Sequence, residues 1–312
     1  MSRGVHGEKI VAAIDSEKTP ECDKDRLRSA LVKYDEWVTS LNHYQAETLS
    51  DFVVGMVSLL NEYKLYIDVD LIFDSHEDFL YRQKGQLKLD NTVIEEFMPI
   101  LVRRCMEKKF GSCKLDVGSQ VSTYSSVYFA SSLSSPGIGG EINIKTKDQD
   151  FSMSRTLYLK SSYSEDFEPD KTAMLTTHIG YVMAELKTNL DKTMFQEAAA
   201  TAHDVKQAVT GAKYYLVCDF LDMTPISTST TDIDEILIVR KAKRISSNLR
   251  KTYSTYAGRT EARDAYVAFL RDHPYSADVF MRFVDHIISQ IQEEDIVADS
   301  VLDAGYFCTT IP

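Results

Sequence analysis

The fold of this chain is decided by residues 178–209, which read HIGYVMAELKTNLDKTMFQEAAATAHDVKQAV. The first part of this segment, up to Lys187, is rich in the residue types that fill buried strands. Thr193 and Gln196 have the spacing of a capping box, and Gly211 is typical of a helix end. We therefore expect a strand that leads directly into a capped helix.

A second apolar run follows this helix at residues 213–220. The order of strand, helix and strand predicts a right-handed crossover between parallel strands. Alternating patterns at 141–145 and 156–160 predict two more strands ahead of it. These patterns together predict an α/β fold, in which helices flank a mixed central β-sheet.

Helical periodicity outside this region predicts that the chain begins and ends with helices. Thr92 and Glu95 have the form of a second capping box. Residues 1–22 lack periodicity and are expected to form a loose segment, while residues 118–140 are rich in serine and glycine and predict a mobile loop. The predicted helices cover residues 25–41, 49–66, 92–108, 259–270 and 277–292.

The composition is that of an ordinary globular protein. The chain has 312 residues, of which 44% are apolar, so it is long enough to bury a large core. It contains no apolar run long enough to span a membrane, and residues 1–9 lack the apolar region of a secretory signal. Five cysteines without a CxxC pair argue against a disulfide framework and a structural zinc site. We expect a cytoplasmic protein without a membrane partner.

The charge distribution is uneven. A net charge of −12 argues against a protein that coats nucleic acid through a generally basic surface. Local positive charge can still bind phosphate, and residues 240–251, RKAKRISSNLRK, hold six basic residues and no acid. This run is either a patch that contacts phosphates or one solvated face of a helix.

The chemistry is suggested by acidic residues near the ends of strands. Glu185 and Lys187 share one face of the predicted strand, whereas Leu186 points into the core. Asp170 follows Pro169 and precedes the same strand. Two carboxylates and one ammonium at one place are what metal-dependent hydrolysis of a phosphodiester needs. The same acid-x-Lys spacing at Glu62/Lys64, Glu107/Lys109 and Asp204/Lys206 falls in predicted helices, where such positions do not share a face.

The pattern Pro169-Asp170 followed by Glu185-Leu186-Lys187 resembles the PD-(D/E)XK nuclease superfamily. The block 184–198, AELKTNLDKTMFQEA, is similar to type II restriction endonucleases that cut interrupted sites with a CT-N-AG core, and residues 147–151 and 157–160 share this likeness. The resemblance implies a restriction-endonuclease-like core at 118–245. It would lie between helical regions at 1–117 and 246–312 and pack with them as one compact unit.

The resemblance implies that Asp170, Glu185 and Lys187 are catalytic and that the cofactor is Mg²⁺. Asp170, Glu185 and the Leu186 carbonyl would hold the metal, because Mg²⁺ prefers oxygen ligands. Lys187 would orient or deprotonate the attacking water and stabilise the charge of the transition state. A neighbouring metal would depress the pKa of Lys187 and favour the role of base.

Several of these assignments have alternatives. Asp166 and Asp150 compete with Asp170 for the first carboxylate, and Glu141 or a glutamate from a preceding helix could join the metal ligands. Gln196 and Glu197 are expected either to support the site or to be a helix cap and a surface charge. The candidate DNA contacts are Arg240, Lys241, Lys243, Arg244, Arg250 and Lys251.

The implied partner is double-stranded DNA. One active site cuts one strand, so cleavage of both strands predicts a homodimer or a heterodimer with a related subunit. The alternative is a catalytically inactive DNA-binding or assembly subunit with a nuclease fold.

Overall fold

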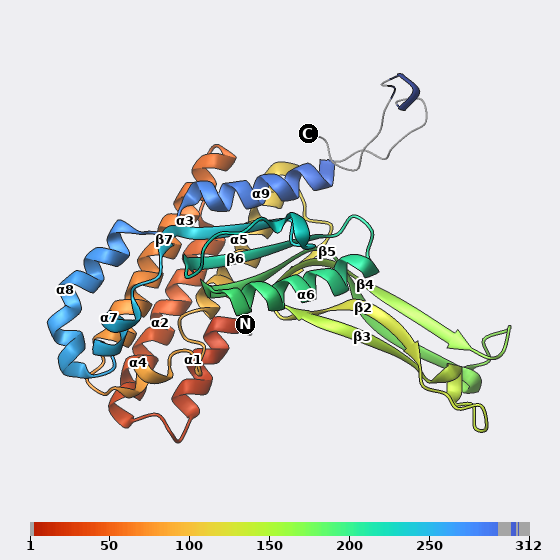
Figure 1. The fold of residues 1–312 in the computed structure, drawn as a ribbon, viewed down its shortest axis with the longest axis horizontal. Coiled ribbons are helices and arrows are strands. Elements are labelled where there is room, and N and C mark those ends of the chain that lie inside the picture. Colours follow the sequence, from red (N-terminus) through yellow and green to blue (C-terminus); the bar gives the residue numbers. More distant parts are fainter. Residues whose placement is uncertain (1–2, 293–300, 304, 306–312) are drawn as a thin grey trace.

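The computed structural model describes residues 3–292, 301–303 and 305. Its helices gather at one end of the molecule and along the sheet, and two long β-hairpins extend from the other end (Figure 1). The N-terminal helices are α1 (Val5–Asp15), α2 (Glu21–His43), α3 (Leu49–Leu65), the π-helix η1 (Tyr66–Phe73), α4 (Phe79–Gln83) and α5 (Thr92–Phe110). Those that follow the sheet strands are α6 (Lys192–Ala208), α7 (Ser247–Thr252), α8 (Tyr256–Asp272) and α9 (Ala277–Gln292).

The sheet has seven strands and is mixed, as predicted. They are β1 (Asp116–Gly118), β2 (Val121–Phe129), β3 (Ile142–Gln149), β4 (Phe151–Ser162), β5 (Thr172–Leu190), β6 (Lys213–Leu221) and β7 (Glu235–Lys243). Short 3₁₀ turns lie at η2 (Ile138–Glu141), η3 (Pro169–Lys171) and η4 (Thr228–Thr230).

Strand β5 organises the sheet because its two halves have different neighbours. Along one edge it pairs antiparallel with β4, from Ser162↔Thr172 to Phe151↔Ala184. Along its C-terminal half it pairs in parallel with β6, which in turn pairs in parallel with β7. The predicted crossover is therefore confirmed as β5–α6–β6.

Helices cover both faces of this C-terminal half. One core contains Val182, Ala184 and Leu186 of β5 together with side chains from α1, α2, α3, α5 and α9. The other contains Met183 and Leu190 with the small-residue stripe of α6. Alternation along the strand thus buries Leu186 on one face and places Glu185 and Lys187 on the α6 face, as predicted.

Four local predictions are wrong. Residues 5–15 form a helix whose Ile10 is fully buried, and residues 121–129 form strand β2 rather than a mobile loop. Thr92 lies inside α5, where its hydroxyl donates to the Lys88 carbonyl instead of capping the helix. The cap of α6 is Asp191, whose carboxylate accepts from the Met194 amide at 2.9 Å, so Thr193 lies inside the helix.

None of the helices that the structure describes is long and apolar enough to cross a membrane.

Candidate active site

Glu185 and Lys187 form an ion pair on β5. The Lys187 Nζ lies 2.7 Å from Glu185 Oε1, and the two side chains are 29% and 19% exposed. The Tyr214 hydroxyl on β6 donates to Glu185 Oε2 at 3.2 Å. The pair is therefore fixed by the neighbouring strand and remains partly open to solvent.

Asp150 lies beside this pair, between the end of β3 and the start of β4. Its Oδ2 accepts from the Leu186 amide at 2.8 Å. The pairing between β4 and β5 ends at Phe151↔Ala184. The Asp150 carboxylate therefore accepts from a β5 amide that lies just beyond the last pair. The hydrogen bond holds the carboxylate next to the backbone that joins Glu185 to Lys187.

The pKa of Asp150 is raised. Burial is the main cause, and the negative charge of Glu185 adds to it, against the opposing effects of the Leu186 amide and the Lys187 charge. A carboxylate that is partly buried beside another negative charge is one that a cation would stabilise.

Glu95, in the first turn of α5, is the glutamate from a preceding helix that the sequence left open. Its side chain is buried, Asn91 Nδ2 donates to Oε1 at 3.3 Å, and Gln120 Nε2 donates to Oε2 at 3.5 Å. Burial raises the pKa of Glu95, and the charge of Asp150 raises it further. The charge of Asp150 thus acts on Glu95 as well as on Lys187.

The structure does not bring Asp170 to this site, so its predicted place beside Glu185 is wrong. Asp170 is exposed in η3, fifteen positions before Glu185, and the chain between them is nearly all one extended strand. Fifteen extended residues span about 50 Å. Asp166 lies in the same turn region, and Glu141 is the last residue of η2, directly before β3, so neither replaces it.

Of the two residues proposed to support the site, Glu197 affects the pKa of Lys187. Both Gln196 and Glu197 are exposed in the first turns of α6. The negative charge of Glu197 contributes to raising the pKa of Lys187. No contact between Gln196 and the carboxylates is present among the described residues.

The Lys187 ammonium is strongly held in its charged form in this structure. Burial lowers its pKa, but the hydrogen bond to Glu185 and the charges of Glu185, Asp150 and Glu197 outweigh burial, so the net pKa is raised. A protonated lysine stabilises negative charge and cannot accept a proton. In the metal-free site Lys187 is therefore suited to charge stabilisation, and a cation bound by Asp150 and Glu185 would act against this shift of its pKa.

The carboxylates of Asp150 and Glu185 suit Mg²⁺ only if water and substrate supply the remaining ligands. Within residues 3–292, 301–303 and 305, no three histidine, cysteine, aspartate or glutamate side chains converge as a metal cage. Mg²⁺ commonly takes one or two carboxylates and completes its shell with water and substrate phosphate. Asp150 and Glu185 fit that pattern, because their repulsion and burial leave negative charge without a full counterion.

Arg240 does not belong to a DNA-contacting patch. It is 4% exposed on β7, its Nη1 donates to the His273 carbonyl at 2.9 Å, and it lies 3.5 Å from Asp68 and 4.0 Å from Asp219. Its guanidinium also lies 4.0 Å from the centre of the Tyr275 ring. Arg240 is therefore part of the buried charge network behind the sheet.

The remaining basic candidates do not lie on one helix: Lys241 and Lys243 are on β7, Arg244 directly follows it, and Arg250 and Lys251 are on α7. Lys241 pairs with Asp278, and Arg244 Nη1 lies 2.8 Å from Asp222 Oδ2. Lys243 and Lys251 are exposed, and Arg250 Nε donates to the Ile245 carbonyl. The run is therefore not one face of a helix, and of its basic residues Arg240 is buried, whereas Lys241, Lys243, Arg244, Arg250 and Lys251 are at least partly accessible.

A polar cavity of about 420 Å³ lies near the C-terminal end of β5, and Glu95, Asp150, Glu185 and Lys187 are not among its lining residues. Thr188 and Asn189, which directly follow Lys187, line it together with Asn91, the partner of Glu95. Arg244 and Arg250 line it as well. Arg244 and Arg250 thus lie along a cavity that reaches the two residues after Lys187 and whose lining also includes Asp68, Asp90 and Asp219.

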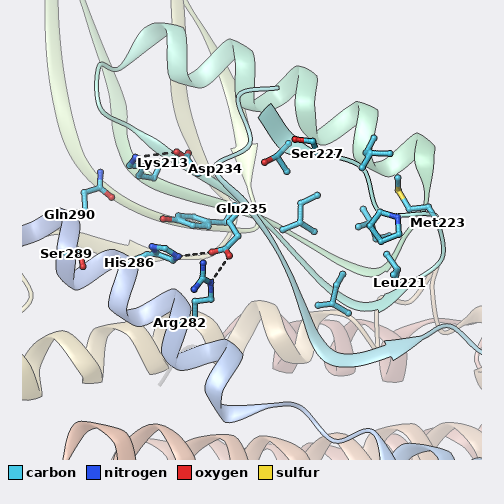
Figure 2. A pocket seen from close by; sticks show the side chains of 17 residues that line it. Lys213, Leu221, Met223, Ser227, Asp234, Glu235, Arg282, His286, Ser289 and Gln290 are labelled. Atoms are coloured by element: carbon cyan, nitrogen blue, oxygen red, sulfur yellow. Dashed lines mark hydrogen bonds and ion pairs between the residues drawn. The ribbon is translucent and has the colours of Figure 1, made fainter. Parts of the chain in front are cut away.

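A second cavity, of about 820 Å³, lies elsewhere (Figure 2). Its labelled charged side chains are engaged with one another: Glu235 lies 2.6 Å from Arg282 and 2.7 Å from His286, and Lys213 lies 3.4 Å from Asp234. None of the carboxylates described above lines it. This cavity is therefore separate from the candidate active site.

Comparisons with known proteins identify a family for this chain. The family model of the Bpu10I restriction endonuclease matches residues 86–307, a range that includes Glu95, Asp150, Glu185 and Lys187. A solved structure described as "native BbvCI A2B2 tetramer at low resolution" is similar to this chain, with 16% sequence identity and a TM-score of 0.47. That match covers 86% of this chain and 97% of the other. No curated protein matches.

Proposed function

Because this chain belongs to the Bpu10I restriction endonuclease family, we propose that it is a type II restriction endonuclease of the PD-(D/E)XK kind. It would hydrolyse phosphodiester bonds of double-stranded DNA at a specific sequence and depend on Mg²⁺. We place its action in the cytoplasm. The observation that carries the proposal is the meeting of Asp150 with the Glu185–Lys187 pair through the Leu186 amide.

Each side chain has a task in this proposal. Asp150 and Glu185, with the Leu186 carbonyl, would hold Mg²⁺, which lowers the pKa of bound water and neutralises the phosphate. Lys187 would, as an ammonium, stabilise the negative charge that develops on the phosphorus oxygens. Glu95 adds a buried negative charge behind Asp150 and favours a bound cation.

The duplex would approach from the side of the polar cavity that contains Arg244 and Arg250. These side chains and the exposed Lys243 and Lys251 would contact phosphates, which position DNA without reading its sequence. Two such active sites are needed to cut both strands, so we propose that the working enzyme is at least a dimer.

Digestion of DNA of known sequence tests this function. We expect discrete fragments whose ends map to one sequence, formed with Mg²⁺ and abolished by EDTA. Specific binding in a gel shift, without cleavage under any divalent cation, would contradict the enzymatic function and support the inactive DNA-binding subunit instead. Cleavage only at nicks or branches would contradict sequence specificity.

A further inference from the structure

Lys88 lies in a strained turn that leads into α5. Its φ is +54°, in the left-handed region that residues with a side chain rarely adopt. Hydrogen bonds fix this conformation, because the Lys88 amide donates to the Gly85 carbonyl at 3.3 Å and the Lys88 carbonyl accepts from the Thr92 hydroxyl. The next residue, Leu89, is fully buried in the main hydrophobic core. The backbone at Lys88 is therefore held in one place.

The fold does not use the side chain of Lys88. A glycine would adopt this φ without strain, yet the glycine of the same turn, Gly85, does not occupy a left-handed position. The Lys88 side chain is exposed, and within residues 3–292, 301–303 and 305 it forms no ion pair or side-chain hydrogen bond. Strain without a structural return is typical of functional positions.

A second strained residue, Gln120, contacts the buried carboxylate of Glu95. Its φ is +55°, and its Nε2 donates to Glu95 Oε2 at 3.5 Å. Besides Lys88 and Gln120, the described non-glycine residues with a positive φ are Glu141, Phe167 and Lys241. Strained backbone positions tend to cluster at active sites, and Gln120 places one of them next to Glu95.

Lys88 lies near two carboxylates of the candidate site. Thr92, whose hydroxyl binds the Lys88 carbonyl, lies three positions before Glu95, on the same face of α5. Burial raises the pKa of Glu95 and of Asp150, and the positive charge of Lys88 opposes that rise in both. Because the effect of a charge weakens with distance, the Lys88 ammonium lies near both carboxylates.

Two lysines thus act on Asp150, and they differ in their partners. Lys187 comes from β5 and is paired with Glu185 at 2.7 Å. Lys88 comes from the turn before α5 and has no such partner in the part of the chain that the structure describes. A cation held by Asp150 and Glu185 would repel the Lys88 ammonium, so that ammonium needs an anion from outside the chain.

We propose that Lys88 binds a phosphate of the DNA strand that this active site cuts. The inference rests on the proposed function, because it adds a contact between the same site and the same substrate. A lysine ammonium is a compact charge with three donors, which suits a phosphate oxygen. Because the turn is fixed before DNA binds, the contact requires little further ordering of the backbone. Lys88 positions the strand and takes no part in proton transfer.

The salt dependence of DNA binding tests this contact. The probe is a fluorescently labelled duplex that the wild-type protein binds, with Ca²⁺ in place of Mg²⁺. Lys88→Ala should lower the slope of log Kd against log salt concentration by about 1, as expected for one lost phosphate contact. Single-turnover cleavage with Mg²⁺ should fall about 10-fold or more, because the strand is less well positioned. Lys88→Arg keeps the charge and should keep the wild-type slope.

Lys88→Gly separates the charge from the strain. It removes the same ammonium as Lys88→Ala, but glycine adopts the left-handed φ freely. We expect it to melt a few degrees above Lys88→Ala and to bind DNA with the same reduced salt dependence. Lower melting temperatures in both variants, with the wild-type salt dependence, would show that Lys88 only stabilises the fold and would overturn the inference.

The matched control is Lys18→Ala. Lys18 is exposed in the turn between α1 and α2, and it too forms no ion pair among the described residues. This variant should keep the wild-type salt dependence and cleavage rate. Wild-type behaviour of Lys88→Ala in both measurements, in a chain that cuts DNA, would overturn the inference alone. A wild-type chain that binds DNA and never cuts it would refute the proposed function, and the salt dependence of that binding would still decide the Lys88 contact.

Discussion

The two halves of strand β5 have the same backbone conformation and different chemistry. The C-terminal half lies between β4 and β6, is covered by helices on both faces, and carries Glu185 and Lys187. The N-terminal half lies in the long hairpin with β4, is mostly half-buried, and begins just after Asp170. Comparison of Glu185 with Asp170 shows that burial and neighbouring charges distinguish a candidate catalytic carboxylate, whereas its distance in sequence from the Glu-x-Lys motif does not.

The largest effect should separate the two ends of the strand. Glu185→Gln is expected to lower single-turnover cleavage by about 10³-fold or more, since it removes a charge that acts directly at the phosphate. Lys187→Ala should do the same. Asp170→Asn, at the exposed end, should cleave like the wild-type protein, and a similar loss in that variant would break the comparison.

Asp150→Asn should follow closely, with a loss of about 10²- to 10³-fold in cleavage. The amide oxygen of asparagine can still accept from Leu186, so the variant should fold normally and bind DNA in a gel shift. Asp166→Asn is the matched control. Full activity of the Asp150 variant would remove the first carboxylate from the account.

Arg240 extends the comparison from carboxylates to basic residues. Arg240→Ala leaves the buried Asp219 without an ion-pair partner and Asp68 with Lys64 alone, and it should destabilise the protein by about 3 kcal/mol, as measured by urea unfolding. Lys251→Ala should leave the unfolding free energy unchanged and weaken DNA binding a few-fold, with a smaller dependence on salt. A stable Arg240 variant with weakened DNA binding would reverse these roles.

Acid should affect Mg²⁺ binding through Asp150 and Glu95, whose pKa values are both raised. Metal requires the deprotonated form, so Mg²⁺-dependent cleavage should fall with decreasing pH at values above the ordinary pKa of a carboxyl group. For stability the sign is opposite. A raised folded-state pKa means that the metal-free protein loses stability as pH rises through that value.

The smallest expected effect follows from the same relation between a raised pKa and lower stability at neutral pH. Glu95→Gln removes a buried negative charge and should raise the melting temperature of the metal-free protein at pH 7 by a few degrees. It should also reduce the further stabilisation that Mg²⁺ provides. A lower melting temperature together with unchanged Mg²⁺ stabilisation would show that Glu95 serves packing alone.

The sequence predicted the crossover and the chemistry of its strand, because period-two alternation and a run of alanines are local signals. It could not decide between Asp170 and Asp150, which it offered only as an alternative. That position depends on the register Phe151↔Ala184 between two strands, and register is set by pairing and not by periodicity within either strand. Proline before Asp170 supplied a motif-like signal in the wrong place.

The basic run at 240–251 was misleading for a related reason. Six charges in twelve residues resemble a surface, yet Arg240 lies on a strand that turns it toward Asp68 and Asp219. The buried acids that satisfy it lie in η1 and β6, far away in sequence. For Glu95 the sequence did contain a local signal, because it is an acid in the first turn of a predicted helix with a capping-box form. The capping box itself does not form.

The most direct measurement is a crystal structure with Mn²⁺ in place of Mg²⁺, in which anomalous scattering locates the metal without regard to activity. We expect an anomalous peak within coordination distance of the carboxylates of Asp150 and Glu185. No peak there in crystals that retain cleavage activity, or a peak beside Asp170, would contradict it.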